Sequence, residues 1–134
     1  MKEKILITGF NGEIGSKTLK ELVKRGKSII AMDITDAKEK IDSVSYINDS
    51  ILNFELITQI FENNNITEVY HFAALLSQTA YRNPELAHDI NEKASRNLID
   101  CACLHGANNH KLIKFFFPSS IAVYGPRKID NASE

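Results

Sequence analysis

The fold is decided by one stretch, ILITGFNGEIG at residues 5–15. An apolar run ends at Thr8, and three glycines follow at three-residue spacing. The turn requires a residue without Cβ at Gly9, a pyrophosphate can approach the backbone only over Gly12, and the helix packs closely on the strand at Gly15. The unpaired N–H groups and the positive dipole end of that helix would face the phosphates. The stretch therefore predicts a phosphate site made by a strand, a glycine turn and a helix.

The residues that follow predict a βαβ unit. A helical pattern extends from about Glu13 to Arg25, and Gly26 marks its stop. A second strand is expected at residues 28–33, which are apolar up to the last residue. A strand, a helix and a strand within about 30 residues form a right-handed βαβ unit, so we expect a parallel sheet.

Asp33 ends this second strand, 18 residues after Gly15. A carboxylate there can accept hydrogen bonds from the adenosine ribose hydroxyls and would repel a 2′-phosphate, which favours NAD over NADP. The alternative is a solvated carboxylate at a strand end.

The middle of the chain predicts a third strand, a helix and a fourth strand. Residues 44–47 form the third strand, apolar residues recur at helical spacing over 54–61, and the fourth strand covers 66–72. Asp49 precedes the helix, so it either caps the helix or contacts the adenine amino group, and the two roles are compatible.

The fourth strand ends in small side chains. Ala73 and Ala74 leave room for a cofactor against the backbone at the carboxyl end of the strand, where open α/β sheets bind ligands. His71 is expected to be a packed, hydrogen-bonded histidine without an acid–base role.

A long helix is expected from Pro84 to Gly106, with an apolar stripe facing the sheet. Asn91 lies beside this stripe on the buried flank, where an amide must find partners. It braces the active-site backbone, binds an ordered water, or makes a simple structural hydrogen bond.

The fifth strand is expected at residues 112–117, buried on both faces. Ser119 and Ser120 follow it. Their hydroxyls would face whatever lies beside the nicotinamide.

The composition and charge of the chain argue against several classes of function. The 134 residues predict one domain, and a net charge of −1 gives no footprint for nucleic acid or for an anionic membrane. No membrane span or signal peptide is expected, so we predict a cytoplasmic protein. Cys101, Cys103, His105 and His110 do not match the usual spacing of zinc ligands, so we expect no metal site.

Together these motifs resemble the extended short-chain dehydrogenase/reductases, the NAD-dependent epimerase/dehydratase family. HFAALLS at residues 71–77 and PSSIAVYGP at residues 118–126 look most like the short-chain-type L-threonine 3-dehydrogenases, and next like sugar-nucleotide 4-epimerases. The resemblance implies a Rossmann-type doubly wound sheet of about five parallel strands, in the order 3-2-1-4-5. Residues 1–134 would be one NAD-binding domain that stops before the sixth strand and the substrate domain.

The resemblance also implies roles for particular residues. NAD would be held by the three glycines and the backbone of the turn, by the two strand-end aspartates and by the small residues of the fourth strand, namely Gly9, Asn11, Gly12, Ile14, Gly15, Asp33, Asp49, Ala73 and Ala74. Ser120 matches the catalytic Ser/Thr, Ser77 and Ser119 would contact substrate, and Asn91 matches the helix asparagine. The intact enzyme would be a homodimer.

The family's acid–base pair, Tyr-x-x-x-Lys on one helix, is expected beyond Glu134. Tyr124 and Lys128 have the same spacing, but Gly125 and Pro126 intervene, so we treat them as a false match. The chain alone is therefore expected to be inactive. The alternatives are a fragment of a sugar-nucleotide 4-epimerase or dehydratase, and a non-catalytic NAD-binding module.

Overall fold

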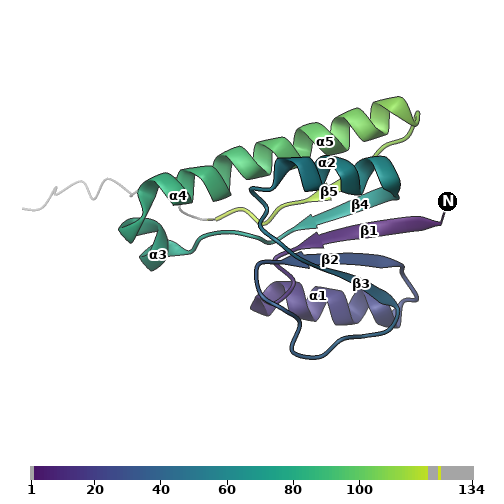
Figure 1. Ribbon diagram of the computed structural model, residues 1–134, viewed down its shortest axis with the longest axis horizontal. Helices are drawn as coiled ribbons and strands as arrows, with labels where there is room; N and C mark the ends of the chain where they lie inside the picture. The colour runs from purple at the N-terminus through teal and green to yellow at the C-terminus, as the bar shows by residue number, and fades with distance from the viewer. Residues whose placement is uncertain (1, 121–123, 125–134) are drawn as a thin grey trace, which may run out of the picture.

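The computed structural model describes residues 2–120 and residue 124, and Figure 1 shows the arrangement of its elements. Helices separate each pair of successive strands except the second and the third. Their order is β1 (Glu3–Thr8), α1 (Glu13–Lys24), β2 (Ile29–Asp33), β3 (Val44–Asn48), α2 (Phe54–Asn63), β4 (Asn65–His71), α3 (Ser77–Arg82), α4 (Pro84–His88), the π-helical segment η1 (Asp89–Ala94), α5 (Ser95–Asn108) and β5 (Lys114–Phe116).

The five strands form one parallel sheet in the order β3-β2-β1-β4-β5, which confirms the predicted order. The strand β1 lies at the centre, with Thr8 opposite Met32 of β2 and opposite His71 of β4. Because the strands are parallel, the carboxyl ends of β1, β2 and β4 meet at one edge of the sheet.

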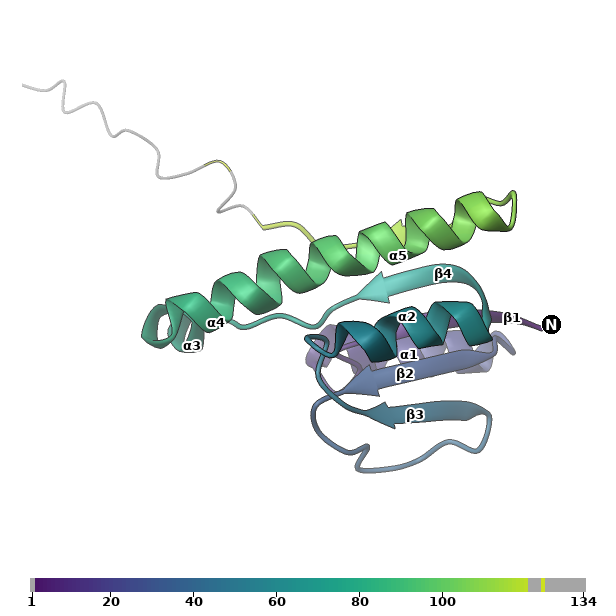
Figure 2. The ribbon, with the colours of Figure 1, turned by 45° about the horizontal axis from the view of Figure 1, so that its top comes forward.

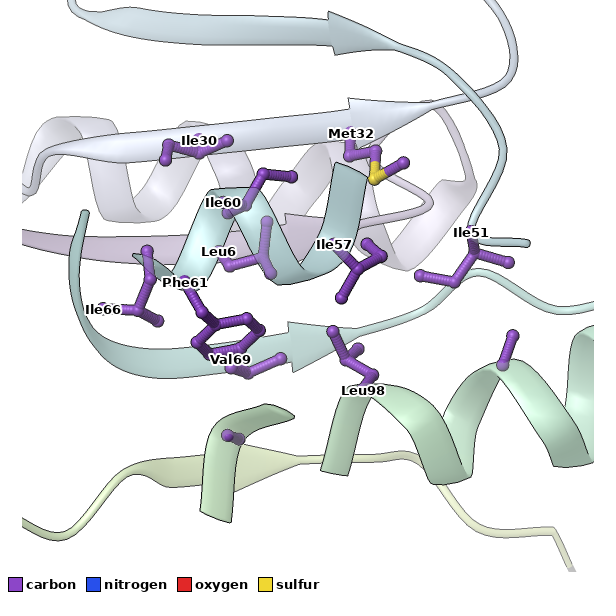
Figure 3. Packing of buried hydrophobic residues seen from close by; sticks show 12 residues of the cluster. Leu6, Ile30, Met32, Ile51, Ile57, Ile60, Phe61, Ile66, Val69 and Leu98 are labelled. Carbon is purple, nitrogen blue, oxygen red and sulfur yellow. The ribbon is translucent and has the colours of Figure 1, made fainter. Parts of the chain in front are cut away.

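Helices cover both faces of the sheet, with α1 on one face and α2 and α5 on the other (Figure 1 and Figure 2). Strand side chains alternate between the two resulting cores. Ile5 and Ile7 pack toward α1, whereas Leu6 packs toward α2 and α5. Figure 3 shows the second core, where Leu6, Ile57 and Leu98 come from three different elements.

The helix predicted from 84 to 106 differs from the observed one in shape. It begins at Pro84 but contains the π-helical segment η1 and ends at Asn108, and the short helix α3, which the sequence did not predict, precedes it. The apolar stripe nevertheless continues across η1, because Ile90, Ala94, Leu98 and Ala102 all pack in the same core. Leu86, which precedes η1, is 41% exposed.

The expectation that the fifth strand is buried on both faces is wrong. The strand β5 is only three residues long, and Phe116 and Phe117 are 45% and 53% exposed. Within the described part of the chain β5 pairs with β4 alone, so one of its edges and part of its surface have no cover. The ring of Phe116 stacks on Tyr70 at a centroid distance of 4.5 Å.

Candidate cofactor site

A cavity of about 250 Å³ lies at the carboxyl ends of the central strands. It is lined by six of the residues that the sequence singled out: Gly9, Gly12, Asp33, Asp49, Ala73 and Ala74. They come from four separate segments, which the parallel sheet brings to one edge. The position agrees with the rule that open α/β sheets bind ligands at strand carboxyl ends.

The glycine turn is tightly packed. Gly9 has φ +71°, and a Cβ there would lie 2.5 Å from the backbone nitrogen of Ala73. A Cβ at Gly15 would lie 2.2 Å from the carbonyl oxygen of Gly9, so the helix α1 packs directly on the turn. At Gly12 the nearest atom would be 3.3 Å away. Of the three glycines in the turn, Gly9 and Gly15 are therefore required by the packing of the protein itself.

Asp33 is held at the rim of the cavity by two residues, Asn11 and Thr35. One carboxylate oxygen of Asp33 accepts the backbone N–H of Asn11 at 3.0 Å, and the other accepts the backbone N–H and the hydroxyl of Thr35 at 3.1 and 3.0 Å. The Asn11 amide donates in turn to the carbonyl and hydroxyl oxygens of Thr35 at 2.8 and 2.7 Å. We call Asn11, Asp33 and Thr35 the rim clamp. The sequence analysis did not predict Thr35, although an aspartate side chain commonly accepts the backbone N–H of the residue two positions later in a turn.

Asp49 lines the cavity but does not cap α2. That cap is Asn53, whose side-chain oxygen accepts the backbone N–H of Leu56. Asp49 instead accepts hydrogen bonds from the backbone N–H of Ser50 and from the side chain of Asn53. The capping alternative is therefore wrong, because Asn53 stands directly before the helix and Asp49 four residues earlier.

Asn91 braces the floor of the cavity. Its amide oxygen accepts the backbone N–H of Leu75 at 2.7 Å, and its amide nitrogen donates to the carbonyl of the same residue at 3.0 Å. These two hydrogen bonds fit both the brace and the simple structural hydrogen bond that the sequence left open. The expectation of a buried flank is wrong, since Asn91 is exposed.

His71 is completely buried directly below this floor. Its ring nitrogens contact the hydroxyls of Thr8 at 2.6 Å and Ser95 at 2.8 Å. Burial lowers the pKa of His71 from 6.5 to about 4, so the ring is neutral near pH 7. It is the packed, hydrogen-bonded histidine that the sequence predicted.

Among the other predicted residues that the structure describes, Ile14, Ser119 and Ser120 do not line the cavity. Ile14 is 59% exposed on α1, and Ser77 is the first residue of α3. Ser119 and Ser120 are exposed in the segment after β5. Tyr124 is 87% exposed, and Lys128 lies outside the described residues.

The described residues lack two features that would indicate other functions. Between residues 2 and 120, no helix has the length and apolar character needed to cross a membrane. The same part of the chain contains no group of three or more His, Cys, Asp or Glu residues arranged to hold a metal ion.

Comparison with known proteins identifies the family. The sequence model of the NAD dependent epimerase/dehydratase family matches residues 5–134. This chain belongs to that family. The cofactor of the family is NAD, and the cavity described above lies where the fold would place it.

Three relatives illustrate the range of the family. The mitochondrial L-threonine 3-dehydrogenase of Bos taurus is 34% identical over 93% of the chain. The holo structure of an L-threonine dehydrogenase from Cupriavidus necator is 31% identical over 92% of the chain, with a TM-score of 0.79. The Thermus thermophilus UDP-glucose 4-epimerase in complex with NAD is 26% identical over 77% of the chain, with a TM-score of 0.70. The chain spans 33%, 39% and 34% of these proteins, respectively.

Proposed function

We propose that residues 1–134 are a single NAD-binding domain of an NAD-dependent oxidoreductase of the L-threonine 3-dehydrogenase type. The observation that carries the proposal is the close approach at Gly9, where the backbone of Ala73 leaves no room for a Cβ. This contact joins the glycine turn to the floor of the cavity. A dinucleotide could then lie across both without meeting a side chain.

The residues of the cavity fit NAD. The first turn of α1 begins at Glu13 immediately after Gly12, so its unpaired N–H groups are available to a pyrophosphate beside Asn11 and Ile14. Asp33 would bind the adenosine ribose through lone pairs that the rim clamp leaves open. Asp49 would reach the adenine, and Ala73 and Ala74 would floor the site.

NAD supplies a hydride acceptor for the oxidation of a secondary alcohol. In this chain Ser120 would donate or accept a hydrogen bond at the reacting hydroxyl, and Ser77 and Ser119 would contact substrate. Tyr124 and Lys128 match only the spacing of the Tyr-x-x-x-Lys pair that would move the proton, because Gly125 and Pro126 lie between them, so we propose that the chain alone is inactive. The same proposal makes the longer protein a cytoplasmic homodimer.

The first test measures cofactor binding by titration calorimetry with the 134-residue chain. We expect saturable, micromolar-range binding of NAD and much weaker binding of NADP. Gly12→Val should abolish binding, because a branched side chain would fill the approach to the helix N-terminus. Lys17→Ala, on the exposed side of α1, is the matched control and should bind normally. Equal binding by wild type and Gly12→Val would refute the mapped site.

The second test concerns the substrate. We expect the native protein to have a mass above 15.1 kDa and to reduce NAD with L-threonine. The UDP-glucose 4-epimerase relative favours one alternative, epimerisation of a sugar nucleotide, which the same preparation would show with UDP-glucose. Turnover of neither substrate would reject both assignments, and a native mass of 15.1 kDa would favour a non-catalytic NAD-binding module.

A further inference from the structure

The hydrogen bonds around His71 have a definite direction. The hydroxyl of Ser95 donates its single hydrogen to the carbonyl of Asn91 at 2.9 Å. The Ser95 oxygen can therefore only accept from the Nε2 atom of His71, 2.8 Å away, so Nε2 carries the ring hydrogen. A neutral ring then has a lone pair on Nδ1, which must accept the hydroxyl hydrogen of Thr8 at 2.6 Å.

The two ends of this chain of hydrogen bonds reach the same short segment. At one end, the oxygen of Thr8 accepts the backbone N–H of Ala73 in a long hydrogen bond of 3.4 Å. At the other end, Asn91 holds both backbone groups of Leu75. Ser95 binds the backbone carbonyl of Asn91 and the Asn91 side chain binds Leu75, so these hydrogen bonds, together with the covalent bonds of Asn91, link β1 and β4 to the cavity floor.

We propose that Thr8, His71 and Ser95 are positioning residues of the cofactor site, and that their hydrogen-bond chain of fixed polarity sets the height of the floor at residues 73–75. The inference rests on the proposed NAD site. A floor that moved toward the turn would collide with Gly9, whose surroundings leave no room, and a floor that moved away would loosen the contact with a bound dinucleotide.

The surroundings of His71 keep this polarity fixed. The rings of Phe115 and Phe117 lie against the imidazole at centroid distances of 6.3 and 5.4 Å, and its two hydrogen-bond partners are uncharged hydroxyls. A second ring hydrogen, on Nδ1, would leave Thr8 without an acceptor for its own hydrogen. The low pKa of His71 follows from the same burial.

Paired variants test the chain of hydrogen bonds. Thr8→Val keeps the shape of the side chain but removes the hydroxyl, and Ser95→Ala removes the other hydroxyl. Each should weaken NAD binding about fivefold, the equivalent of about 1 kcal/mol for one hydrogen bond. Thr8→Ser and Ser95→Thr keep the hydroxyls and should restore the affinity to within about twofold of wild type. All affinities are measured by calorimetry at a temperature where circular dichroism shows every variant folded.

A spectroscopic measurement on wild type needs no variant. Nitrogen-15 NMR of the His71 side chain should show the Nε2–H tautomer, unchanged from pH 7 down to about pH 5. The Nδ1–H tautomer, or unchanged NAD affinity in both Thr8→Val and Ser95→Ala, would overturn the inference. Lower thermal stability without weaker NAD binding would show a purely structural role and would also overturn it. Failure of wild type to bind NAD at all would instead refute the proposed function. The tautomer found by NMR would then still test the direction of the hydrogen bonds around His71.

Discussion

The rim and the floor of the cavity are both fixed by hydrogen bonds, but in different ways. The rim clamp joins residues on the surface, and its backbone and side-chain groups remain in contact with water. At the floor, Thr8, His71 and Ser95 are buried, and only Asn91, which braces Leu75, is exposed among these four residues. At the rim, water can replace a hydrogen-bond partner that a substitution removes. At the floor, removing one partner leaves a buried polar group with no hydrogen bond. We therefore expect changes at the floor to cost more than changes at the rim.

The largest effect is expected where the floor meets the glycine turn. Gly9→Ala combines a positive φ with a Cβ only 2.5 Å from the Ala73 backbone, so we expect a loss of more than about 3 kcal/mol in the free energy of unfolding. Gly26→Ala is a matched control, because Gly26 also has φ +71° but no atom within 4 Å of the added Cβ. It should cost about 1 kcal/mol. Urea unfolding measures the free energy of unfolding of both variants. Equal losses in the two variants would show that the contact with the Ala73 backbone does not affect stability.

An intermediate effect is expected from the titration of His71. Its pKa is 6.5 when unfolded and about 4 when folded, so the unfolded chain binds more protons between these values. Stability should therefore fall as pH decreases from about 6.5 to about 4, by up to about 3 kcal/mol from this residue. In His71→Gln this part of the pH dependence should vanish. The urea midpoints of wild type and His71→Gln are measured at several pH values. Parallel plots of midpoint against pH for the two proteins would contradict the predicted contribution of His71.

The smallest effect is expected at the rim. Thr35→Val removes one hydroxyl and Asn11→Ala removes the amide that joins the two loops, so each should lower stability by roughly 0.5–1 kcal/mol. We expect NAD binding to weaken about twofold to fivefold, with a smaller preference over NADP, since Asp33 would be held less firmly. The ratio of the NAD and NADP dissociation constants is the measurement. Losses in the free energy of unfolding as large as that of Gly9→Ala would end the distinction between the two regions.

The sequence predicted the elements that depend on local pattern. The glycine spacing, the apolar strands and the stop at Gly26 predicted the parallel sheet, because backbone conformation and periodicity are encoded in neighbouring residues. The strand order was predicted by the family resemblance and not by these local patterns. It did not predict the π turn at η1 or the partners of His71, which depend on contacts between residues far apart in the chain. The sequence also did not predict Asn53 as the cap of α2, because Asp49, four residues earlier, is an equally good type of capping residue.

The central position of β1 also matters while the protein is being synthesised on the ribosome. Thr8 and His71 are 63 residues apart, so a ribosome needs on the order of several seconds to supply the second after the first. During that time β1, α1 and β2 exist without β4, and the apolar edge of β1 has no neighbour on that side. Such an edge is a template for pairing with other chains. The edge of β1 is therefore open to pairing with other chains until β4 has been made.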